Sequence, residues 1–199
     1  MMLNTPSYLT DRQISKLGLK SVGNNVKISK YANFYGAQFI SIGSDSRIDD
    51  FCILSASPEG LVSVGNHVHI SAGVHLYGAA GVQIADFSGL SSGVKIYSTS
   101  DDFSGNFMTN PTLPSNYLNV HRGVVVIERH VIIGAGTVIL PGVKIGEGVA
   151  VGALSLVTKS LSAWHVYVGQ PVRKIKTRSK KLLKLEKEFM AVQHKRTGV

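Results

Sequence analysis

The sequence is poor in cysteine and contains no long apolar segment. Cys52 is the only cysteine among the 199 residues, so no disulfide can form within the chain. No stretch approaches the roughly 20 apolar residues that a membrane-spanning helix needs. The first twenty residues lack an apolar run of signal-peptide type. These absences predict a soluble, cytoplasmic protein, and the length suits one packed domain.

Acidic residues are also scarce, and the resulting positive charge is unevenly distributed. Twelve Asp and Glu accompany 21 Lys and Arg, which gives a formal net charge of +9. Residues 173–196 hold ten Lys or Arg against two Glu, whereas the rest of the chain holds eleven against ten acids. A basic segment of this kind suits cofactor phosphates, nucleic acid or an anionic membrane surface, or it forms the solvated face of a helix.

Aliphatic residues recur at every sixth position, and a small or β-branched residue usually follows each of them four places later. A period of six fits neither an α-helix nor a long alternating strand, but it fits the short strand and turn of a hexapeptide solenoid. Three hexads make one triangular coil, with the aliphatic residue inside and the small residue, such as Cys52, at the corner. The sequence predicts six coils over residues 21–172, opened by Val22, Ile42, Val64, Ile84, Ile127 and Ile145.

One interruption in the repeat is long. Between the coils opened by Ile84 and Ile127, residues 99–124 leave the prism. Long excursions from a compact scaffold are usually functional or disordered. This one carries Phe103, Phe107 and Tyr117, so we expect it to pack, and a neighbouring subunit is one candidate surface.

Both ends of the solenoid are expected to be capped by helices. Within the N-terminal segment 1–20, Thr10 followed by Asp11 predicts a short helix near residues 10–18. The basic segment 173–199 is predicted to form a docked amphipathic helix, near residues 178–194. Its apolar stripe consists of Leu182, Leu185, Phe189 and Val192.

The run VVVIERHVIIGAGTVILPGVKIGEGVAVGALSLVTKSL, with YVGQPVRKIK after it, resembles the hexapeptide-repeat acyltransferases, which include galactoside, xenobiotic and nucleotide-sugar acetyltransferases. The resemblance covers about residues 22–178. It implies an all-β fold, a left-handed parallel β-helix that works as a homotrimer. It also implies acetyl-CoA as cosubstrate, bound in a groove between neighbouring subunits.

Motif matching implies six cofactor contacts, at Ala135, Ala153, Thr158, Lys159, Arg173 and Lys176. Small residues let the pantetheine arm approach the backbone closely, and Lys and Arg pair with phosphate oxygens. Tight packing is the alternative explanation for the two alanines, and plain solvation is the alternative for the basic residues.

The catalytic position departs from the family pattern. The family's usual base is a histidine at the start of the excursion, and Asp101 stands at that position here, followed by Asp102. A carboxylate is a weak base for a sugar hydroxyl, but it is adequate for orienting an amine or accepting its proton. The hexad register places His69 and His75 on the outer face, where either is an alternative base. Lys95 occupies the register of His75 one coil later.

The resemblance implies an acetyl-CoA-dependent sugar acetyltransferase, and Asp101 favours an amino group as its acceptor. The expected acceptor is therefore a nucleotide-linked amino-deoxy sugar of surface-polysaccharide synthesis, such as O-antigen, lipopolysaccharide or capsule. O-acetylation of a sugar hydroxyl stays open. A metal-dependent hydratase is a second alternative, although the spacing in HVHISAGVH matches no metal motif and no metal site is assigned. A non-enzymatic module that binds nucleic acid or membrane through the tail is a third, although that tail lacks aromatics beyond Phe189.

Overall fold

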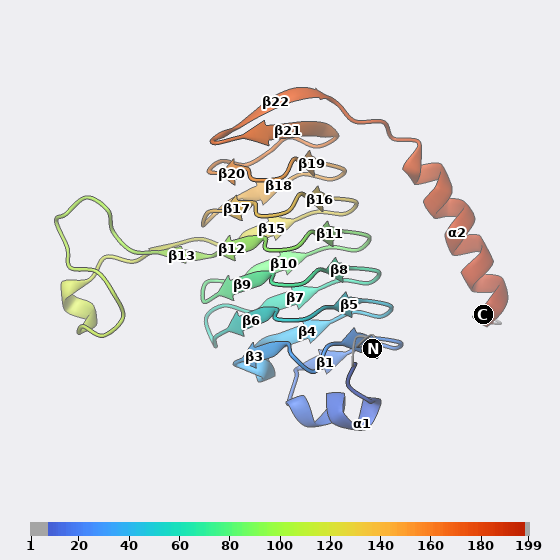
Figure 1. Cartoon of the computed structure of the whole chain (residues 1–199), viewed down its shortest axis with the longest axis horizontal. Coiled ribbons are helices and arrows are strands. Elements are labelled where there is room, and N and C mark those ends of the chain that lie inside the picture. Colours follow the sequence, from blue (N-terminus) through green and yellow to red (C-terminus); the bar gives the residue numbers. More distant parts are fainter. Residues whose placement is uncertain (1–7, 198–199) are drawn as a thin grey trace, which may run out of the picture.

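The computed structural model describes residues 8–197. They form a stack of coils that winds into a triangular prism, with a long excursion and a helix on opposite sides of it (Figure 1). Each coil contributes one short parallel strand to each of three sheets. The prism therefore has three flat outer faces, and side chains that point outward from one sheet share one face.

The three sheets are named here by their order along a coil. Sheet 1 contains β1 (Ser21–Val22), β4 (Ile40–Ile42), β7 (Val62–Val64), β10 (Val82–Ile84), β15 (Val125–Ile127) and β18 (Lys144–Ile145). Sheet 2 contains β2 (Lys27–Ile28), β5 (Arg47–Ile48), β8 (His69–Ile70), β11 (Gly89–Leu90), β16 (Ile132–Ile133), β19 (Ala150–Val151), β21 (His165–Gly169) and β22 (Val172–Thr177). Sheet 3 contains β3 (Asn33–Tyr35), β6 (Ile53–Ala56), β9 (His75–Gly78), β12 (Lys95–Tyr97), β17 (Val138–Ile139) and β20 (Leu156–Val157).

The aliphatic residue of each hexad fills the interior, as the period of six predicts. Ile48 pairs in register with Ile70, and Ile70 with Leu90, and all three side chains are buried. The corner positions are buried as well, including Ser46 and Cys52. Cys52 is an inert core residue, because burial raises the pKa of its thiol to about 11.

The stack contains the six predicted coils and a partial seventh. Leu161 forms a parallel bridge with Ile145, and Tyr167 of β21 pairs with Val151 of β19. The strand β22 then pairs antiparallel with β21 and covers the open edge of sheet 2. Residues 172–177 are therefore strand, and the expectation of a helical segment from residue 173 needs correction, because α2 (Leu182–Thr197) begins only at Leu182.

A short helix caps the other end. The helix α1 (Asp11–Ile14) continues into the 3-10 turn η1 (Ser15–Leu17), close to the predicted range 10–18. Thr10 and Gln13 form a reciprocal capping box, and buried Ile14 covers the first coil.

The helix α2 lies beside the corner between sheets 1 and 2 (Figure 1). Glu186 accepts hydrogen bonds from Arg129 and His130, and the ring of Phe189 meets the ring of His67 edge-on with centroids 5.2 Å apart. The rest of the predicted stripe is less engaged, since Leu185 is 64% and Val192 52% exposed in the single chain. We call this contact, made by Glu186 and Phe189, the helix clasp.

The helix clasp is testable by proteolysis. We expect Glu186→Ala to accelerate tryptic cleavage within α2 at least about fivefold, because it removes charge-assisted hydrogen bonds to Arg129 and to nearly buried His130. Glu188→Ala is the matched control, since the carboxylate of Glu188 is exposed and lies 3.9 Å from Lys184. Equal cleavage rates in the two variants would show that Glu186 does not hold the helix.

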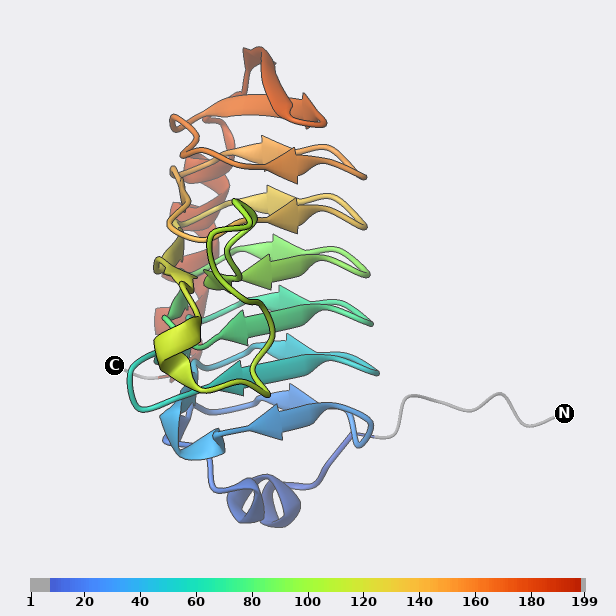
Figure 2. The same cartoon turned by 90° about the vertical axis from the view of Figure 1, so that its left-hand side faces the viewer.

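The excursion begins as a two-stranded ribbon, β13 (Thr99–Ser100) paired with β14 (His121–Arg122), and contains the 3-10 turn η3 (Ser115–Tyr117). A further 3-10 turn, η2 (Ala37–Phe39), lies on the second coil. Arg122 anchors the ribbon by donating to the Glu59 carboxylate and to the Ala79 carbonyl, each at 2.8 Å. Beyond this anchor the excursion stands away from the prism (Figure 1), and it lies in front of the coils in the view of Figure 2. Its Phe103 side chain is 91% exposed. Among the described residues, no helix is long and apolar enough to cross a membrane.

Candidate active site

A cavity of about 540 Å³ lies where the excursion leaves the prism. Sheet 3 and the turn after it contribute Tyr97 and Leu140, and the excursion contributes Asp101, Phe103 and Leu118. The walls are mostly apolar, and Asp101 is the only acidic residue in the lining. The cavity thus places one carboxylate against a mostly apolar wall.

The two adjacent aspartates have different surroundings. The Asp102 carboxylate accepts hydrogen bonds from the Ser104 backbone at 2.8 Å and from Asn119 Nδ2 at 2.9 Å. The hydrogen bonds from Ser104, and then the one from Asn119, lower the pKa of Asp102. In the described part of the chain, no hydrogen bond or ion pair engages the Asp101 carboxylate. Asp102 therefore organises the loop, whereas Asp101 is free to meet a ligand.

His75 lies on the outer face of sheet 3, the face that leads to the cavity. It pairs in register with Lys95, as predicted, and its Nδ1 lies 3.2 Å from the hydroxyl of Tyr77. Burial, and then the charge of Lys95, lower the pKa of His75, so its imidazole is neutral near pH 7. The ring of Tyr77 stacks on that of Tyr97, with centroids 5.0 Å apart, and Tyr97 lines the cavity.

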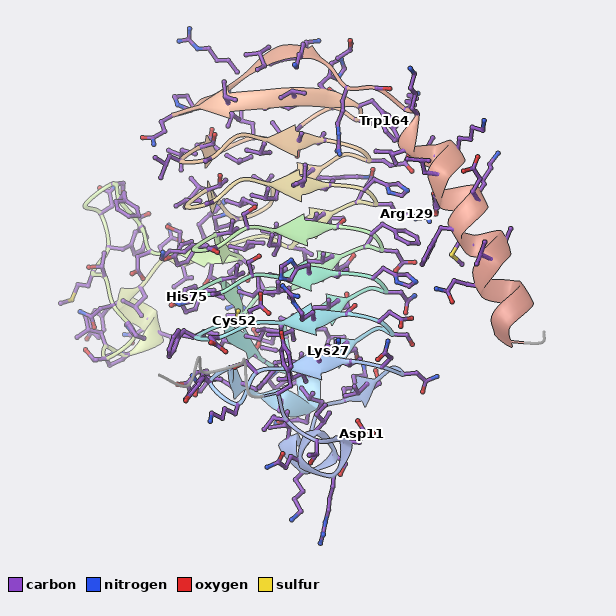
Figure 3. All side chains as sticks on the ribbon, turned by 45° about the vertical axis from the view of Figure 1, so that its right-hand side comes forward. Asp11, Lys27, Cys52, His75, Arg129 and Trp164 are labelled. Atoms are coloured by element: carbon purple, nitrogen blue, oxygen red, sulfur yellow. The ribbon has the colours of Figure 1, made fainter. Side chains whose placement is uncertain are left out.

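His69 belongs to a different surface. It projects from β8 of sheet 2, where its Nε2 lies 2.7 Å from Asp49 Oδ2 and 2.8 Å from Arg47 Nη2. His69 and His75 thus lie on different sheets and do not converge. The described residues contain no group of three or more His, Cys, Asp or Glu arranged to hold a metal. Figure 3 shows His75 on the side of the excursion and Arg129 at the corner beside α2.

Four of the six residues matched to cofactor contacts border sheet 3. Ala135 and Ala153 are exposed on successive coils at the corner between sheets 2 and 3, and the amide of Leu154 donates to the carbonyl of Ala135 at 2.8 Å. Thr158 and Lys159 follow the C-terminal end of β20, on the side of sheet 3 away from the corner that carries Ala135 and Ala153. They neighbour Leu140 of the cavity, whose amide donates to Val157 at 3.0 Å.

The other two matched residues lie elsewhere. Arg173 and Lys176 are exposed on β22 of sheet 2, paired with Val168 and Val166. A single subunit therefore does not bring them to the cavity or to the corner that carries Ala135. Their assignment to the cofactor stays a prediction.

Sequence reasoning missed Tyr77 and Tyr97. The signal was present, because the alternation along β12 that turns Lys95 outward also turns Tyr97 outward, with buried Ile96 between them. Nothing in the sequence indicated that both tyrosines lie beside the excursion, since that placement depends on how the ribbon leaves the prism.

Comparison with known proteins adds independent findings. A family model described as bacterial transferase hexapeptide (six repeats) matches residues 125–159. An Escherichia coli protein, dTDP-4-amino-4,6-dideoxy-D-glucose acyltransferase, is 49% identical over 183 residues, covering 92% of this chain and 95% of the relative. A chloramphenicol acetyltransferase of Klebsiella aerogenes is 34% identical over 84 residues, 41% of this chain and 40% of the relative.

The solved structures agree. The crystal structure of AntD, an N-acyltransferase from Bacillus cereus, in complex with dTDP and 3-hydroxybutyryl-CoA, is 48% identical with a TM-score of 0.91, covering 96% of this chain and 100% of that one. A maltose O-acetyltransferase from Clostridium difficile shares the fold at 23% identity, with a TM-score of 0.56 and coverage of 88% and 81%.

Proposed function

This chain belongs to the hexapeptide-repeat acyltransferases, and we propose that it moves an acyl group from acyl-CoA to the amino group of a dTDP-linked 4-amino-4,6-dideoxy sugar. The observation that carries the proposal is the 49% identity, over almost the whole chain, to an enzyme named for that acceptor. The Asp101 carboxylate, in a cavity whose walls are mostly apolar, is chemically consistent with an amine acceptor. The coil is the left-handed parallel β-helix of this family.

The cosubstrate is an acyl-CoA. Related AntD structures hold coenzyme A or 3-hydroxybutyryl-CoA, which is consistent with the expected acetyl-CoA. The acyl chain itself is left to experiment, and both acetyl-CoA and 3-hydroxybutyryl-CoA belong in the assay.

Transfer requires a neutral amine, an aligned thioester and a route for one proton. The amine nitrogen attacks the thioester carbon and the new C–N bond forms. The C–S bond then breaks, and the departing CoA thiolate takes up the proton that the amine has lost, so CoA leaves as the thiol. We assign Asp101 to orienting the amine or accepting the proton that it loses after attack. A neutral amine is already nucleophilic, so this step needs no strong base.

A serine is a second candidate contact in the site. Solved variants of AntD alter a serine and an aspartate ten residues further along that chain. The same spacing separates Ser91 from Asp101 here, and also Ser92 from Asp102, whose carboxylate is held by Ser104. Ser91 follows β11 at the corner between sheets 2 and 3, before β12 begins. Asp101 lies beyond the C-terminal end of β12.

In one subunit, Ser91 and Asp101 lie beyond opposite ends of the sheet 3 strand β12. We therefore propose that the site is completed by a neighbouring copy in a homotrimer. The exposed apolar side chains of the excursion support this assembly, because they need a surface to cover them. They are Phe103, Phe107, Met108 and Tyr117. A cytoplasmic site of action and a place in surface-polysaccharide synthesis complete the proposal.

Thiol release tests the proposed activity. The purified chain is mixed with acetyl-CoA or 3-hydroxybutyryl-CoA and a panel of dTDP-linked and UDP-linked amino sugars, and free CoA is measured with a thiol reagent. Buried Cys52 adds little background in the folded protein. We expect release only with a nucleotide amino sugar, and fastest with a dTDP-linked one. No release with any amine would overturn the proposed function.

A further inference from the structure

The outer face of sheet 3 beside the cavity carries a cation without a counter-charge. One outward-facing position, directly before the buried residue of each strand, forms a row across successive coils. Register pairing places Ile53, His75, Lys95, Val138 and Leu156 in this row. No acid stands in this row. The half-buried Lys95 Nζ has one polar contact in the described structure, the Gly93 carbonyl at 3.5 Å. No carboxylate of the described residues forms an ion pair with it.

Phenol groups flank this cation. In the neighbouring row, Tyr77 pairs in register with Tyr97, one residue beyond the buried strand centre. Their rings are stacked, and Tyr97, which lies two residues after Lys95 on the same strand, lines the cavity itself. His75 is neutral near pH 7 because burial and the charge of Lys95 lower its pKa. Lys95 is therefore the fixed positive charge of this face, surrounded by groups that donate hydrogen bonds without bringing negative charge.

We propose that Lys95 binds the diphosphate of the nucleotide-sugar acceptor, with the Tyr97 hydroxyl beside it, while the amino group of the sugar meets Asp101 in the cavity. This inference rests on the proposed function and adds the residue that binds the acceptor's phosphates. Lysine suits this role as a point charge for phosphate oxygens. Lys95 is then a positioning residue of the acceptor, remote from the bonds that change.

The position of Lys95 beside the cavity lining favours the acceptor over CoA as the source of the phosphates. Lys95 lies on β12 two residues before Tyr97, and Tyr97 and Asp101 line the same cavity. In the acceptor, one sugar ring separates the amine from the diphosphate. In acyl-CoA the whole pantetheine arm separates the thioester from the phosphates, so a cation near the reacting centre matches the acceptor.

Binding measurements on the full chain test this assignment without relying on turnover. Titration calorimetry is run separately with dTDP and with CoA on wild type, Lys95→Met and Lys95→Arg. Lys27→Met is the matched control, because Lys27 is an exposed strand lysine on sheet 2. We expect Lys95→Met to weaken dTDP binding at least about tenfold, Lys95→Arg to recover part of that loss, and CoA binding to stay within about twofold. The KM for the nucleotide sugar should rise in parallel while kcat changes less.

Each alternative result has a clear meaning. Unchanged dTDP affinity in Lys95→Met, with an unchanged melting temperature, would overturn the assignment even if transfer itself is intact. Selective loss of CoA affinity would also overturn it and place CoA phosphates on this face. A wild-type chain that binds dTDP through Lys95 but acylates no amine would instead contradict the proposed function alone.

Discussion

Asp101→Asn is expected to lower kcat/KM for acyl transfer at least about 100-fold, while leaving the fold intact. The substitution preserves shape but removes the negative charge and the proton-accepting ability of the one acidic side chain that lines the cavity. Removal of a positioned acid or base typically costs roughly 10²–10⁴ in rate. The measurement is steady-state release of CoA with a fixed nucleotide amino sugar, accompanied by thermal melting of each variant.

Asp102→Asn is the matched control for that experiment. Its carboxylate is fully occupied by Ser104 and Asn119, so the change should loosen the loop and lower kcat/KM less than about tenfold. Equal losses in both variants would mean that loop order rather than the Asp101 charge is decisive. Unchanged turnover in both would move the chemistry to His75, which lies on the face leading to the cavity.

Ile133→Ala is expected to destabilise the prism by about 2–5 kcal/mol. Ile133 is fully buried on β16 and pairs in register with the inward residues Leu90 and Val151 of the coils on either side. Truncation leaves a cavity that rigidly stacked coils can close only partly. Urea denaturation followed by circular dichroism measures the change in the free energy of unfolding.

The preceding residue is an internal control for the hexad register. Ile132 lies on the same strand but points outward and is 47% exposed, so Ile132→Ala should change the free energy of unfolding by less than about 1 kcal/mol. A larger effect from Ile132 than from Ile133 would mean that the inward and outward positions are exchanged in solution, or that Ile132 is covered by another subunit. Measuring both variants over a range of protein concentrations separates these cases, because subunit burial makes stability depend on concentration.

The fold was predictable because the same six-residue spacing of inward aliphatic residues recurs in every coil of the prism. A period of six allows one inward residue for each short strand, so residues such as Ile70 and Leu76 were placed inside correctly from spacing alone. The C-terminal end was harder. The alternating run Val172–Thr177 breaks the period of six, and only its antiparallel pairing with β21 makes it a strand. The partial seventh coil was missed for the same reason, since Leu161 continues the stack outside the regular hexads.

The site was predictable only in part, because it depends on how distant segments meet. The position of Asp101 at the start of the excursion, and the pairing of His75 with Lys95, followed from register and from resemblance. The different environments of Asp101 and Asp102 did not, since they arise from the loop contacts of Ser104 and Asn119. The separation of His69 from His75 likewise required knowing that a corner of the prism lies between β8 and β9.

One measurement tests the central claim most directly. A single-turnover reaction compares dTDP-4-amino-4,6-dideoxyglucose with the analogue that has a hydroxyl group at the same carbon, and mass spectrometry identifies the acylated product. We predict rapid formation of an amide that resists hydroxylamine, together with one equivalent of CoA, from the amine alone. Comparable acylation of the hydroxyl analogue, or a hydroxylamine-labile ester as the main product, would contradict the assignment of this chain as a nucleotide-sugar N-acyltransferase.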